Sequence, residues 1–264
     1  VKNDRVVQSF SFERYLPLGS VTAIVQNLDR WGVDDIIVLN IDRTANKIGP
    51  NLDVIKKISS IPISTPLTYG GGIGCLKDAL DVISNGAERV IVDNLFINKP
   101  SEIKKISEIA HNHKLNMHMD GARFANALVS LDCSPAEMTW KSGIDVLSFG
   151  ATKNGCLAAE AIIFFKPELV GNLPFLMKRA GHLLSKMSFV SAQLDAYITN
   201  EVWLRNAKHA NAMGKKLSQG LDQHKNIELA YPTDANEIFV KIPKDIIDQL
   251  NSEGYTINDD EWDG

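Results

Sequence analysis

Apolar runs typical of strands alternate with helically spaced apolar residues over the first hundred residues of the chain. Residues 35–40 form such a run, and the flanking residues 20–31 and 52–60 carry apolar side chains at helical spacing. Strands that alternate with helices are typical of βαβ units, whose strands build a parallel sheet. We therefore expect an α/β fold. The expected strands are residues 5–10, 35–40, 66–69 and 89–92, and the expected helices are residues 20–31, 52–60 and 77–85.

The carboxyl ends of these expected strands carry polar residues and glycines. Asn40 ends the second strand and Asp42 lies just after it, and three glycines at 70–72 follow the third. Functional groups of open parallel sheets lie at this edge. The glycines either let backbone N–H groups approach an anion closely or make a tight turn between strand and helix. The sequence leaves both alternatives open.

Four stretches of this half, residues 1–7, 34–39, 49–51 and 68–73, resemble the cyclase subunit of imidazole glycerol phosphate synthase. That family is a (β/α)8 barrel, so residues 1–100 are expected to form a half-barrel with Gly71, Gly72 and Asn94 as its phosphate loop. Asp93 stands where the family has an amide, and its charge would repel phosphate. The family uses two catalytic aspartates. By alignment, the first falls just before Val1 and the second on a fifth strand, so residues 1–100 contain neither. We therefore expect no cyclase activity from these residues.

A different pattern starts near residue 101, with an acid at a strand end and a lysine in a glycine-flanked loop. Asp120 ends one expected strand, and Lys153 lies in the loop 150–155 between two others. Because both flanking strands are expected to be buried, the lysine amine should be partly removed from water, which is costly for its charged form. We therefore expect an amine suited to covalent chemistry. Pyridoxal 5'-phosphate (PLP) needs a lysine, an acid beside its ring nitrogen and donors for its phosphate. The expected strands are residues 115–120, 145–149, 161–165 and 237–242, and the expected helices are residues 103–113, 124–131 and 245–250.

Two motifs, residues 118–127 and 145–155, carry a close resemblance to low-specificity L-threonine aldolases, which are PLP enzymes of fold type I. The resemblance covers residues 102–264. It implies that Lys153 binds PLP covalently, that Asp120 pairs with the pyridine nitrogen, and that Arg123 contacts the ring hydroxyl or the substrate carboxylate. The other implied contacts are Ser148 and Thr152 with the cofactor phosphate, and Arg179 and Lys186 with the substrate carboxylate or a neighbouring subunit.

The implied reaction is cleavage of a β-hydroxy-α-amino acid, such as threonine, to glycine and an aldehyde. PLP takes up the electrons left when the Cα–Cβ bond breaks, and a base removes the β-hydroxyl proton. The family's phosphate loop, its ring-stacking histidines and a carboxylate-binding arginine lie outside the resemblance. We therefore expect a PLP-dependent lyase of amino-acid metabolism with a partial site, whose activity stays open. The alternative is a cyclase-like, sugar-phosphate-binding protein of histidine or surface-polysaccharide biosynthesis.

The two resemblances predict a chimera of α/β fold, joined near residues 98–102. The expected domains are a partial (β/α)8 half-barrel at 1–100, a segment of the PLP-dependent transferase large domain at 101–225, and the start of its small domain at 226–264. Family members are usually tetramers. We therefore expect a homo-oligomer that takes a small-molecule amino-acid substrate.

Composition argues against several other classes of protein. The net charge of −4 is not that of a nucleic-acid-binding surface. No apolar run reaches the length of a membrane helix, and residues 1–5 are too polar for a secretory signal. The three cysteines lack the C-x-x-C spacing of a metal site, so we expect free thiols in the cytoplasm and no bound metal.

Some residues of the second half have a structural interpretation. His118 is expected to be a packed strand residue, and His111 and His113 are expected to be solvated at a helix end. Apolar residues also recur at helical spacing and predict a core face or a subunit interface. They are Leu183, Met187, Val190, Leu194 and Tyr197.

Overall fold

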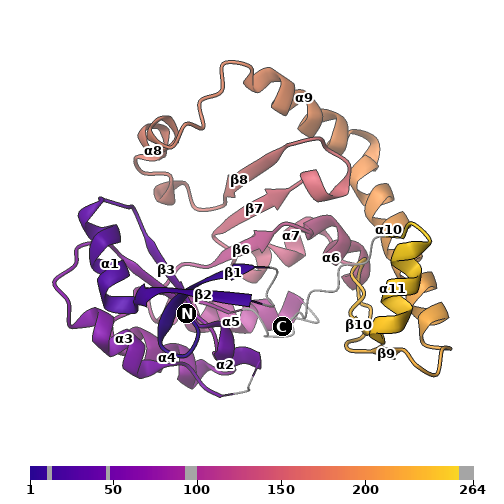
Figure 1. Ribbon diagram of the computed structural model, residues 1–264. Helices are drawn as coiled ribbons and strands as arrows, with labels where there is room; N and C mark the ends of the chain where they lie inside the picture. Colours follow the sequence, from indigo (N-terminus) through magenta and orange to yellow (C-terminus); the bar gives the residue numbers. More distant parts are fainter. Residues whose placement is uncertain (11–13, 46–47, 93–99, 256–264) are drawn as a thin grey trace. The chain divides into compact units, whose positions relative to one another are not determined.

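The computed structural model describes residues 1–10, 14–45, 48–92 and 100–255 (Figure 1). These residues divide into two compact units. Unit 1 comprises the described residues up to 92, and unit 2 comprises those from 100 onward. Each unit has its own hydrophobic core and contains both helices and strands, so the chain is a mixed α/β protein.

Unit 1 contains a parallel three-stranded sheet, as the alternation of strands and helices predicts. The strand order is β3-β4-β5, and both pairs are parallel. The sheet strands are β3 (Ile36–Leu39), β4 (Leu67–Gly70) and β5 (Arg89–Ile91), and the helices between them are α1 (Val21–Arg30), α3 (Leu52–Ser59) and α4 (Leu76–Ser84). These elements confirm the ranges expected from the sequence to within two residues at either end.

The first expected strand lies outside this parallel sheet. β1 (Arg5–Phe10) pairs antiparallel with β2 (Arg14–Ser20) in a two-stranded sheet. The sequence did not predict β2, because Pro17 and Gly19 both disfavour a strand. They are tolerated here because β2 pairs with β1 alone and needs no second ladder of hydrogen bonds. A short helix, α2 (Ile41–Ala45), follows β3.

The core of unit 1 is made of apolar side chains from its helices and sheet. Their burial removes apolar surface from water, which is the main favourable contribution to folding. Ser20 and Asn51 are the N-cap residues of α1 and α3. The side-chain oxygen of each accepts a hydrogen bond from the backbone N–H three residues later in the chain. The most buried core side chains are Val25, Val54, Ile55, Ile58, Tyr69 and Val82.

Unit 2 consists of a three-stranded sheet, the helices packed on it and a small carboxyl-terminal part. Its strands are β6 (His118–Gly121), β7 (Val146–Gly150), β8 (Glu160–Phe164), β9 (Glu228–Leu229) and β10 (Val240–Lys241). Its helices are α5 (Pro100–Asn112), α6 (Phe124–Leu131), α7 (Pro135–Met138), α8 (Leu173–Arg179), α9 (Met187–Ile198), α10 (Val202–Leu221) and α11 (Lys244–Ser252). The expected strand at 237–242 is shorter than predicted, since β10 is two residues long.

The sheet of unit 2 has the order β6-β7-β8. β6 and β7 are parallel, whereas β7 and β8 form an antiparallel pair. Across the first pair, Asp120 is the partner of Ser148 and Gly121 is the partner of Phe149. Because side chains alternate along a strand, partnered residues point to the same face. One face of this sheet therefore carries Asp120 and Ser148, and the opposite face carries Phe149.

Four aromatic side chains form the centre of the unit 2 core. Phe124 of α6 meets Phe149 edge to face with ring centroids 5.9 Å apart, and stacks on Trp203 of α10 with centroids 6.4 Å apart. Tyr197 of α9 completes the cluster, 6.0 Å from Phe149. Such pairs add favourable geometry to the burial of large apolar surfaces. The cluster holds α9 and α10 against one face of the sheet.

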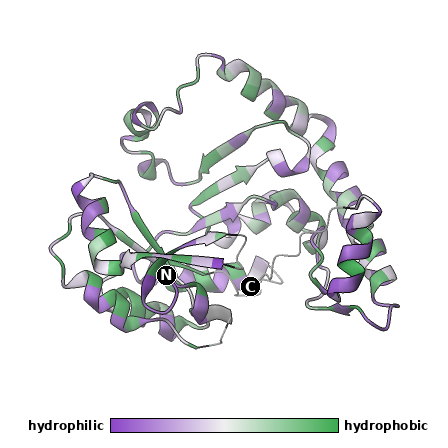
Figure 2. Cartoon of the chain, viewed as in Figure 1, coloured by the Kyte–Doolittle hydropathy of each residue, from purple (hydrophilic) through white to green (hydrophobic). Residues whose placement is uncertain are grey.

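The predicted apolar stripe of 183–197 divides between core and surface. Tyr197 is buried, and Val190 and Leu194 are partly buried against the same core. Met187 is exposed, and Leu183 is exposed and lies before α9 begins. β8 is mostly hydrophobic (Figure 2). Its Ile162 is nevertheless 60% exposed. Among the helices that the structure describes, none is long and apolar enough to cross a membrane.

Candidate functional site

The candidate site lies on the face of the unit 2 sheet opposite the aromatic cluster. His118 and Asp120 of β6 point to this face, because they are two residues apart on one strand. Ser148 of β7 shares the face through its register with Asp120. His118 and Asp120 are exposed, and Ser148 is half-buried. The structure thus brings two of the residues predicted from sequence, Asp120 and Ser148, onto adjacent parallel strands.

Asp120 is positioned at the carboxyl end of β6. Its Oδ1 accepts a hydrogen bond of 2.9 Å from the Ala122 amide, which fixes the carboxylate over the turn that follows the strand. Its Oδ2 makes no hydrogen bond to any other residue that the structure describes. One carboxylate oxygen is therefore held, and the other remains available to a proton-bearing ligand atom.

His118 differs from its expectation as a packed strand residue. Its side chain is exposed, and its Nε2 lies 2.8 Å from Ser148 Oγ. The ring is exposed because its position on β6 points to the face away from the core. The signal that it shares a face with Asp120 was already in the sequence, as the spacing of two residues on a strand.

Lys153 lies in a short 3-10 turn, Thr152–Asn154, that follows β7 directly. Its side chain is exposed, so the expectation of a desolvated lysine is wrong. The turn explains the difference, because it directs Thr152 and Lys153 outward while Asn154 is directed inward and half-buried. Both Asp120 and Lys153 belong to the carboxyl ends of adjacent parallel strands, where functional groups of such sheets lie.

Thr152 is engaged within its own loop. Its hydroxyl donates to the Ala159 carbonyl at 3.3 Å and accepts from the Ala159 amide at 3.1 Å. Its backbone amide donates to Glu160 Oε1 at 3.3 Å. These bonds close the β7–β8 loop at its base, and contact between Thr152 and a cofactor phosphate stays a prediction.

Arg123 begins α6 as its N-cap residue. Its Nη2 forms an ion pair of 2.6 Å with Glu237 Oε1, a partner that the sequence did not suggest. Its Nε is buried and has no hydrogen-bond partner among the described residues. Buried donors of this kind are costly unless they are paired, so Nε is a place where a ligand oxygen would be stabilised.

Arg179 and Lys186 lie on other elements of unit 2. Arg179 is the last residue of α8, and Lys186 is the N-cap residue of α9. Both are exposed. Their roles toward a substrate carboxylate or a neighbouring subunit stay predictions.

The glycines of unit 1 have a complete steric explanation. Gly71 and Gly72 both have positive φ, 111° and 74°. A Cβ on Gly72 would lie 2.6 Å from the Ile48 carbonyl oxygen, and a Cβ on Gly71 would clash with the Asn40 carbonyl. The tight-turn alternative therefore accounts for both glycines, and the anion-binding role stays a prediction. Asn94, the third residue of the expected phosphate loop, lies outside the described residues, as does Asp93.

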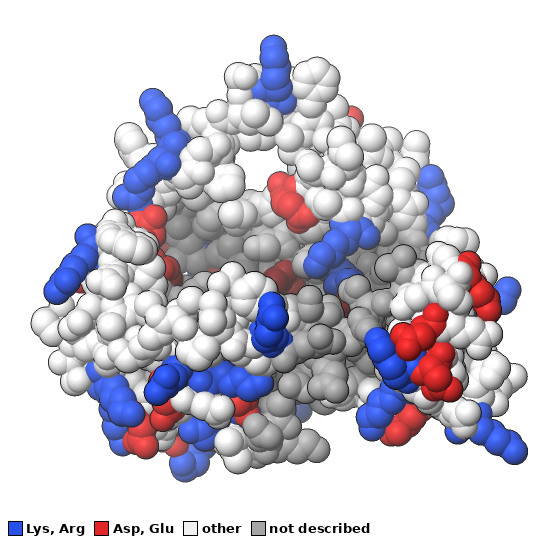
Figure 3. All heavy atoms as spheres, in the orientation of Figure 1, with Lys and Arg blue, Asp and Glu red and all other residues white. Residues whose placement is uncertain are grey.

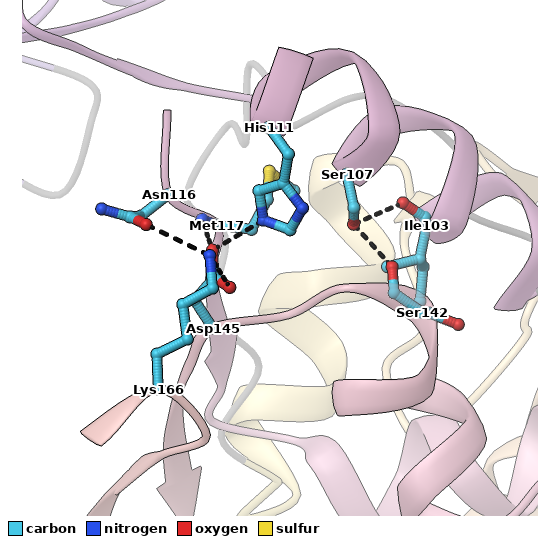
Figure 4. Close-up of polar contacts among 8 residues, drawn as sticks. All are labelled: Ile103, Ser107, His111, Asn116, Met117, Ser142, Asp145 and Lys166. Carbon is cyan, nitrogen blue, oxygen red and sulfur yellow. Dashed lines mark hydrogen bonds and ion pairs between the residues drawn. The ribbon is translucent and has the colours of Figure 1, made fainter. Parts of the chain in front are cut away.

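An ion-pair cluster around the buried Asp145 of unit 2 was not predicted from the sequence (Figure 4). Asp145 is buried, with Lys166 Nζ 2.7 Å from its Oδ1 and His111 Nε2 2.9 Å from its Oδ2. The Met117 amide donates to Oδ2 at 2.7 Å. Burial alone raises the pKa of Asp145, but the hydrogen bonds from Lys166, Met117 and His111 outweigh it and hold this pKa below its ordinary value. His111 is therefore paired and not merely solvated.

Comparison with known proteins gives two overlapping family matches. The family model described as "Beta-eliminating lyase" matches residues 97–244. The model described as "Histidine biosynthesis protein" matches residues 1–165. Each match covers more than half of the chain, and the two overlap over residues 97–165.

Individual relatives repeat this division. The low specificity L-threonine aldolase of Pseudomonas sp. is 43% identical over 157 residues, which are 60% of this chain and 45% of that protein. The imidazole glycerol phosphate synthase subunit HisF of Thermococcus gammatolerans is 24% identical over 172 residues, 62% of this chain and 63% of that protein. The chain thus spans less than two thirds of either relative.

A solved structure shares the fold. Leishmania major threonine aldolase matches with a TM-score of 0.57 and 23% identity, over 78% of this chain and 56% of that chain. At this identity the likeness concerns the fold alone. Together with the family matches, these results show that the chain belongs both to the beta-eliminating lyase family, through residues 97–244, and to the histidine biosynthesis protein family, through residues 1–165.

Proposed function

We propose that unit 2 binds PLP and acts as a carbon–carbon lyase on a β-hydroxy-α-amino acid such as threonine. The observation that carries this proposal is the placement of Asp120 and Lys153 at the carboxyl ends of two adjacent parallel strands. The 43% identity to a low specificity L-threonine aldolase supports the substrate class. In fold terms, we propose that unit 2 is a segment of a PLP-dependent transferase large domain followed by the start of the small domain.

The residues present fit the cofactor at two points of the structure. Arg123 Nε is a buried donor without a partner among the described residues, which suits an oxygen of the cofactor. Asp120 presents a carboxylate oxygen from the end of β6, which suits a protonated ring nitrogen. Ser148 lies on the same sheet face, and its hydroxyl is oriented by His118. Thr152 and Ser148 are the proposed phosphate contacts.

Each residue has a distinct task in the proposed reaction. When bound, PLP supplies an electron sink for the pair left on Cα as the Cα–Cβ bond breaks. Lys153 Nζ holds the cofactor covalently, and the Asp120 carboxylate keeps a proton on the ring nitrogen. Arg123 donates from Nε to a cofactor or substrate oxygen, while its Nη2 stays paired with Glu237. Arg179 and Lys186 are the proposed carboxylate contacts.

A titration with PLP tests cofactor binding separately from turnover. PLP held by a lysine absorbs at a longer wavelength than free PLP, and we expect this band to appear in the wild-type protein. Lys153→Ala removes the amine and should abolish the band. Lys208→Ala, an exposed lysine of α10, is the matched control and should retain it. A band that survives in Lys153→Ala would contradict the assignment.

Turnover is measured in the same preparation with L-threonine. We expect release of glycine and acetaldehyde that depends on added PLP and is absent in Lys153→Ala. If the protein shows the band but releases no glycine, the result supports cofactor binding and contradicts the proposed lyase activity. The lyase part can therefore fail while the cofactor-binding part stands.

A second function is proposed for unit 1, on the basis of Asn40. Its side chain is buried, and its Oδ1 has no hydrogen-bond partner among the described residues. It lies at the carboxyl end of β3, next to the turn of Gly71. We propose that this edge of a half-barrel binds a sugar phosphate. Ribose 5-phosphate should raise the Tm of the wild type and leave Asn40→Ala unaffected, and an unchanged Tm in the wild type would contradict it.

The proposed partners follow from the lyase function and the surface. The substrate is a small-molecule amino acid, and a homo-oligomer is the proposed assembly. On the face shown in Figure 3, basic and acidic side chains are interspersed, as around α11, where Lys244 pairs with Asp248. A nucleic-acid partner is not part of the proposal, and neither is a membrane. The proposed location is the cytoplasm.

A further inference from the structure

Side chains of α9 and α10 hold the turn that carries Lys153. We propose that Asn206, together with Tyr197, is a positioning residue for Lys153. This inference rests on the proposed PLP function. Neither side chain is expected to touch the cofactor, since both act through Asn154, the residue next to Lys153.

Hydrogen bonds to Asn154 fix the carboxyl-terminal side of the turn. Asn206 Nδ2 donates to the Asn154 carbonyl at 2.9 Å. The side chain of Asn154 donates in turn to Tyr197 Oη at 2.6 Å and to the Trp203 carbonyl at 2.9 Å. Asn154 is thus bound through both its backbone and its side chain. Tyr197 and Trp203 belong to the aromatic cluster, so the turn is connected to the buried core of unit 2.

The residues that follow the turn are held in the same way. Gln193 Oε1 of α9 accepts hydrogen bonds from the Leu157 amide at 2.9 Å and the Ala158 amide at 3.2 Å. Gly155 has a φ of 124°, and a Cβ there would lie 2.8 Å from Asn206 Nδ2. The close approach shows that the backbone of the loop rests directly on the Asn206 amide. A side chain at position 155 would displace the Asn206 amide from this contact.

These hydrogen bonds around the turn matter because the Lys153 side chain is itself exposed. An exposed lysine has many rotamers, and only the position of its Cα limits where its amine can reach. Fixed neighbours on both sides keep that Cα at the carboxyl end of β7, the strand adjacent and parallel to the one that ends with Asp120 and Gly121. Holding two groups at a defined separation is what makes their joint action fast, and a small displacement lowers the rate strongly. Asn206 would therefore control the reactivity of Lys153 without contacting the reacting atoms.

Asn206→Asp is the sharpest variant for a test. Aspartate has the same shape as asparagine but presents an oxygen where the Nδ2 donor stood, so the bond to the Asn154 carbonyl is lost. Asn206 is exposed, so the free energy of unfolding should change little. Tyr197→Phe is the second variant, and it removes the acceptor for Asn154 Nδ2 without changing the ring. Lys208→Ala, on the same helix as Asn206, is the control.

The measurement is the rate at which PLP labels Lys153. The Nζ amine condenses with the aldehyde of added PLP and releases one water, and borohydride then reduces the C=N bond to a stable adduct. Peptide mass spectrometry gives the share of adduct on Lys153 and on every other lysine. We expect Asn206→Asp and Tyr197→Phe to slow labelling of Lys153 by roughly 10- to 100-fold. Labelling of the other lysines and the urea midpoint should stay as in the wild type.

Three outcomes decide between the claims. Selective slowing at Lys153 supports the positioning role, because a merely structural role would change the urea midpoint or all lysines alike. Variants that label Lys153 at the wild-type rate overturn the positioning role and leave the proposed function intact. A wild type that shows no preference for Lys153 overturns the proposed function, and the positioning role with it.

Discussion

At the scale of single residues, the contacts of Asp145 were the part of unit 2 least accessible from sequence. Its partners Met117, His111 and Lys166 are 28, 34 and 21 residues away in the chain, so no local spacing reports them. The exposure of Lys153 was equally hidden, because a strand–loop–strand pattern does not reveal which loop residues point outward. The identities of Asp120 and Lys153, by contrast, were visible from the motifs around them.

Asp145 predicts a pH dependence of stability. Because its folded-state pKa lies below the unfolded value, its contribution to stability is present above the unfolded pKa and is lost as the pH falls through the folded one. The free energy of unfolding in urea should therefore decrease from neutral to acidic pH. Asp145→Asn should lower the free energy of unfolding by about 2 kcal/mol at pH 7, and this free energy should then decrease less between neutral and acidic pH. If the decrease is as large in Asp145→Asn as in the wild type, other carboxylates cause it.

Arg123 predicts a specific loss of cofactor affinity. Arg123→Lys keeps the positive charge beside Glu237 but lacks the Nε donor and the planar fork of arginine. The Kd for PLP should rise about tenfold, which corresponds to ~1.4 kcal/mol. The free energy of unfolding without PLP should change by less than about 1 kcal/mol, since the ion pair with Glu237 is partly exposed. Equal PLP affinity in the wild type and Arg123→Lys would contradict a contact between Arg123 and the cofactor.

At the scale of elements, the sequence located the strands of both three-stranded sheets and six of the helices, but it did not predict α8 or the 20-residue α10. The ranges of α6 and α3 followed from apolar spacing, because periodicity reports the buried face of a helix directly. β2 was missed because Pro17 and Gly19 hide its strand character. β7 pairs antiparallel with β8 across the Lys153 loop, whose backbone also contacts α9 and α10, which lie far along the chain.

Gly121 predicts that part of the Asp-Gly-Ala-Arg motif is needed for packing. A Cβ on Gly121 would lie 2.6 Å from the Ser148 carbonyl oxygen, so the backbones of β6 and β7 approach too closely for alanine. Gly121→Ala should lower the free energy of unfolding of unit 2 by about 1–3 kcal/mol. Gly220→Ala is the matched control on α10, where a Cβ meets no atom within 4 Å. It should be neutral or raise stability by about 0.4–1 kcal/mol. Equal effects of both substitutions would contradict the packing argument.

At the scale of the whole molecule, the chain combines residues of two families and two separate cores. The core of unit 1 contains Ile55 and Val82, and the core of unit 2 contains Leu147 and Phe149. The sequence showed this change of pattern near residue 100, because each resemblance depends on its own local motifs. The boundaries of the three expected domains remain a proposal, as does the half-barrel of unit 1.

The separate cores predict that destabilisation stays within one unit. Ile55→Ala and Leu147→Ala each remove a fully buried side chain and should cost about 2–5 kcal/mol in their own unit. Amide hydrogen exchange by mass spectrometry resolves the two regions. Ile55→Ala should speed exchange in α3 and β4 alone, and Leu147→Ala should speed it in β6, β7 and α10 alone. Faster exchange across both units in either variant would show that they unfold together.

The lysine on which PLP is trapped decides whether unit 2 holds the cofactor through Lys153. The wild-type protein is incubated with PLP, reduced with borohydride, digested and analysed by peptide mass spectrometry. We predict that the adduct is found predominantly on Lys153, and that Asp120→Ala weakens this preference. An adduct spread evenly over the exposed lysines, with no preference for Lys153, would contradict the account.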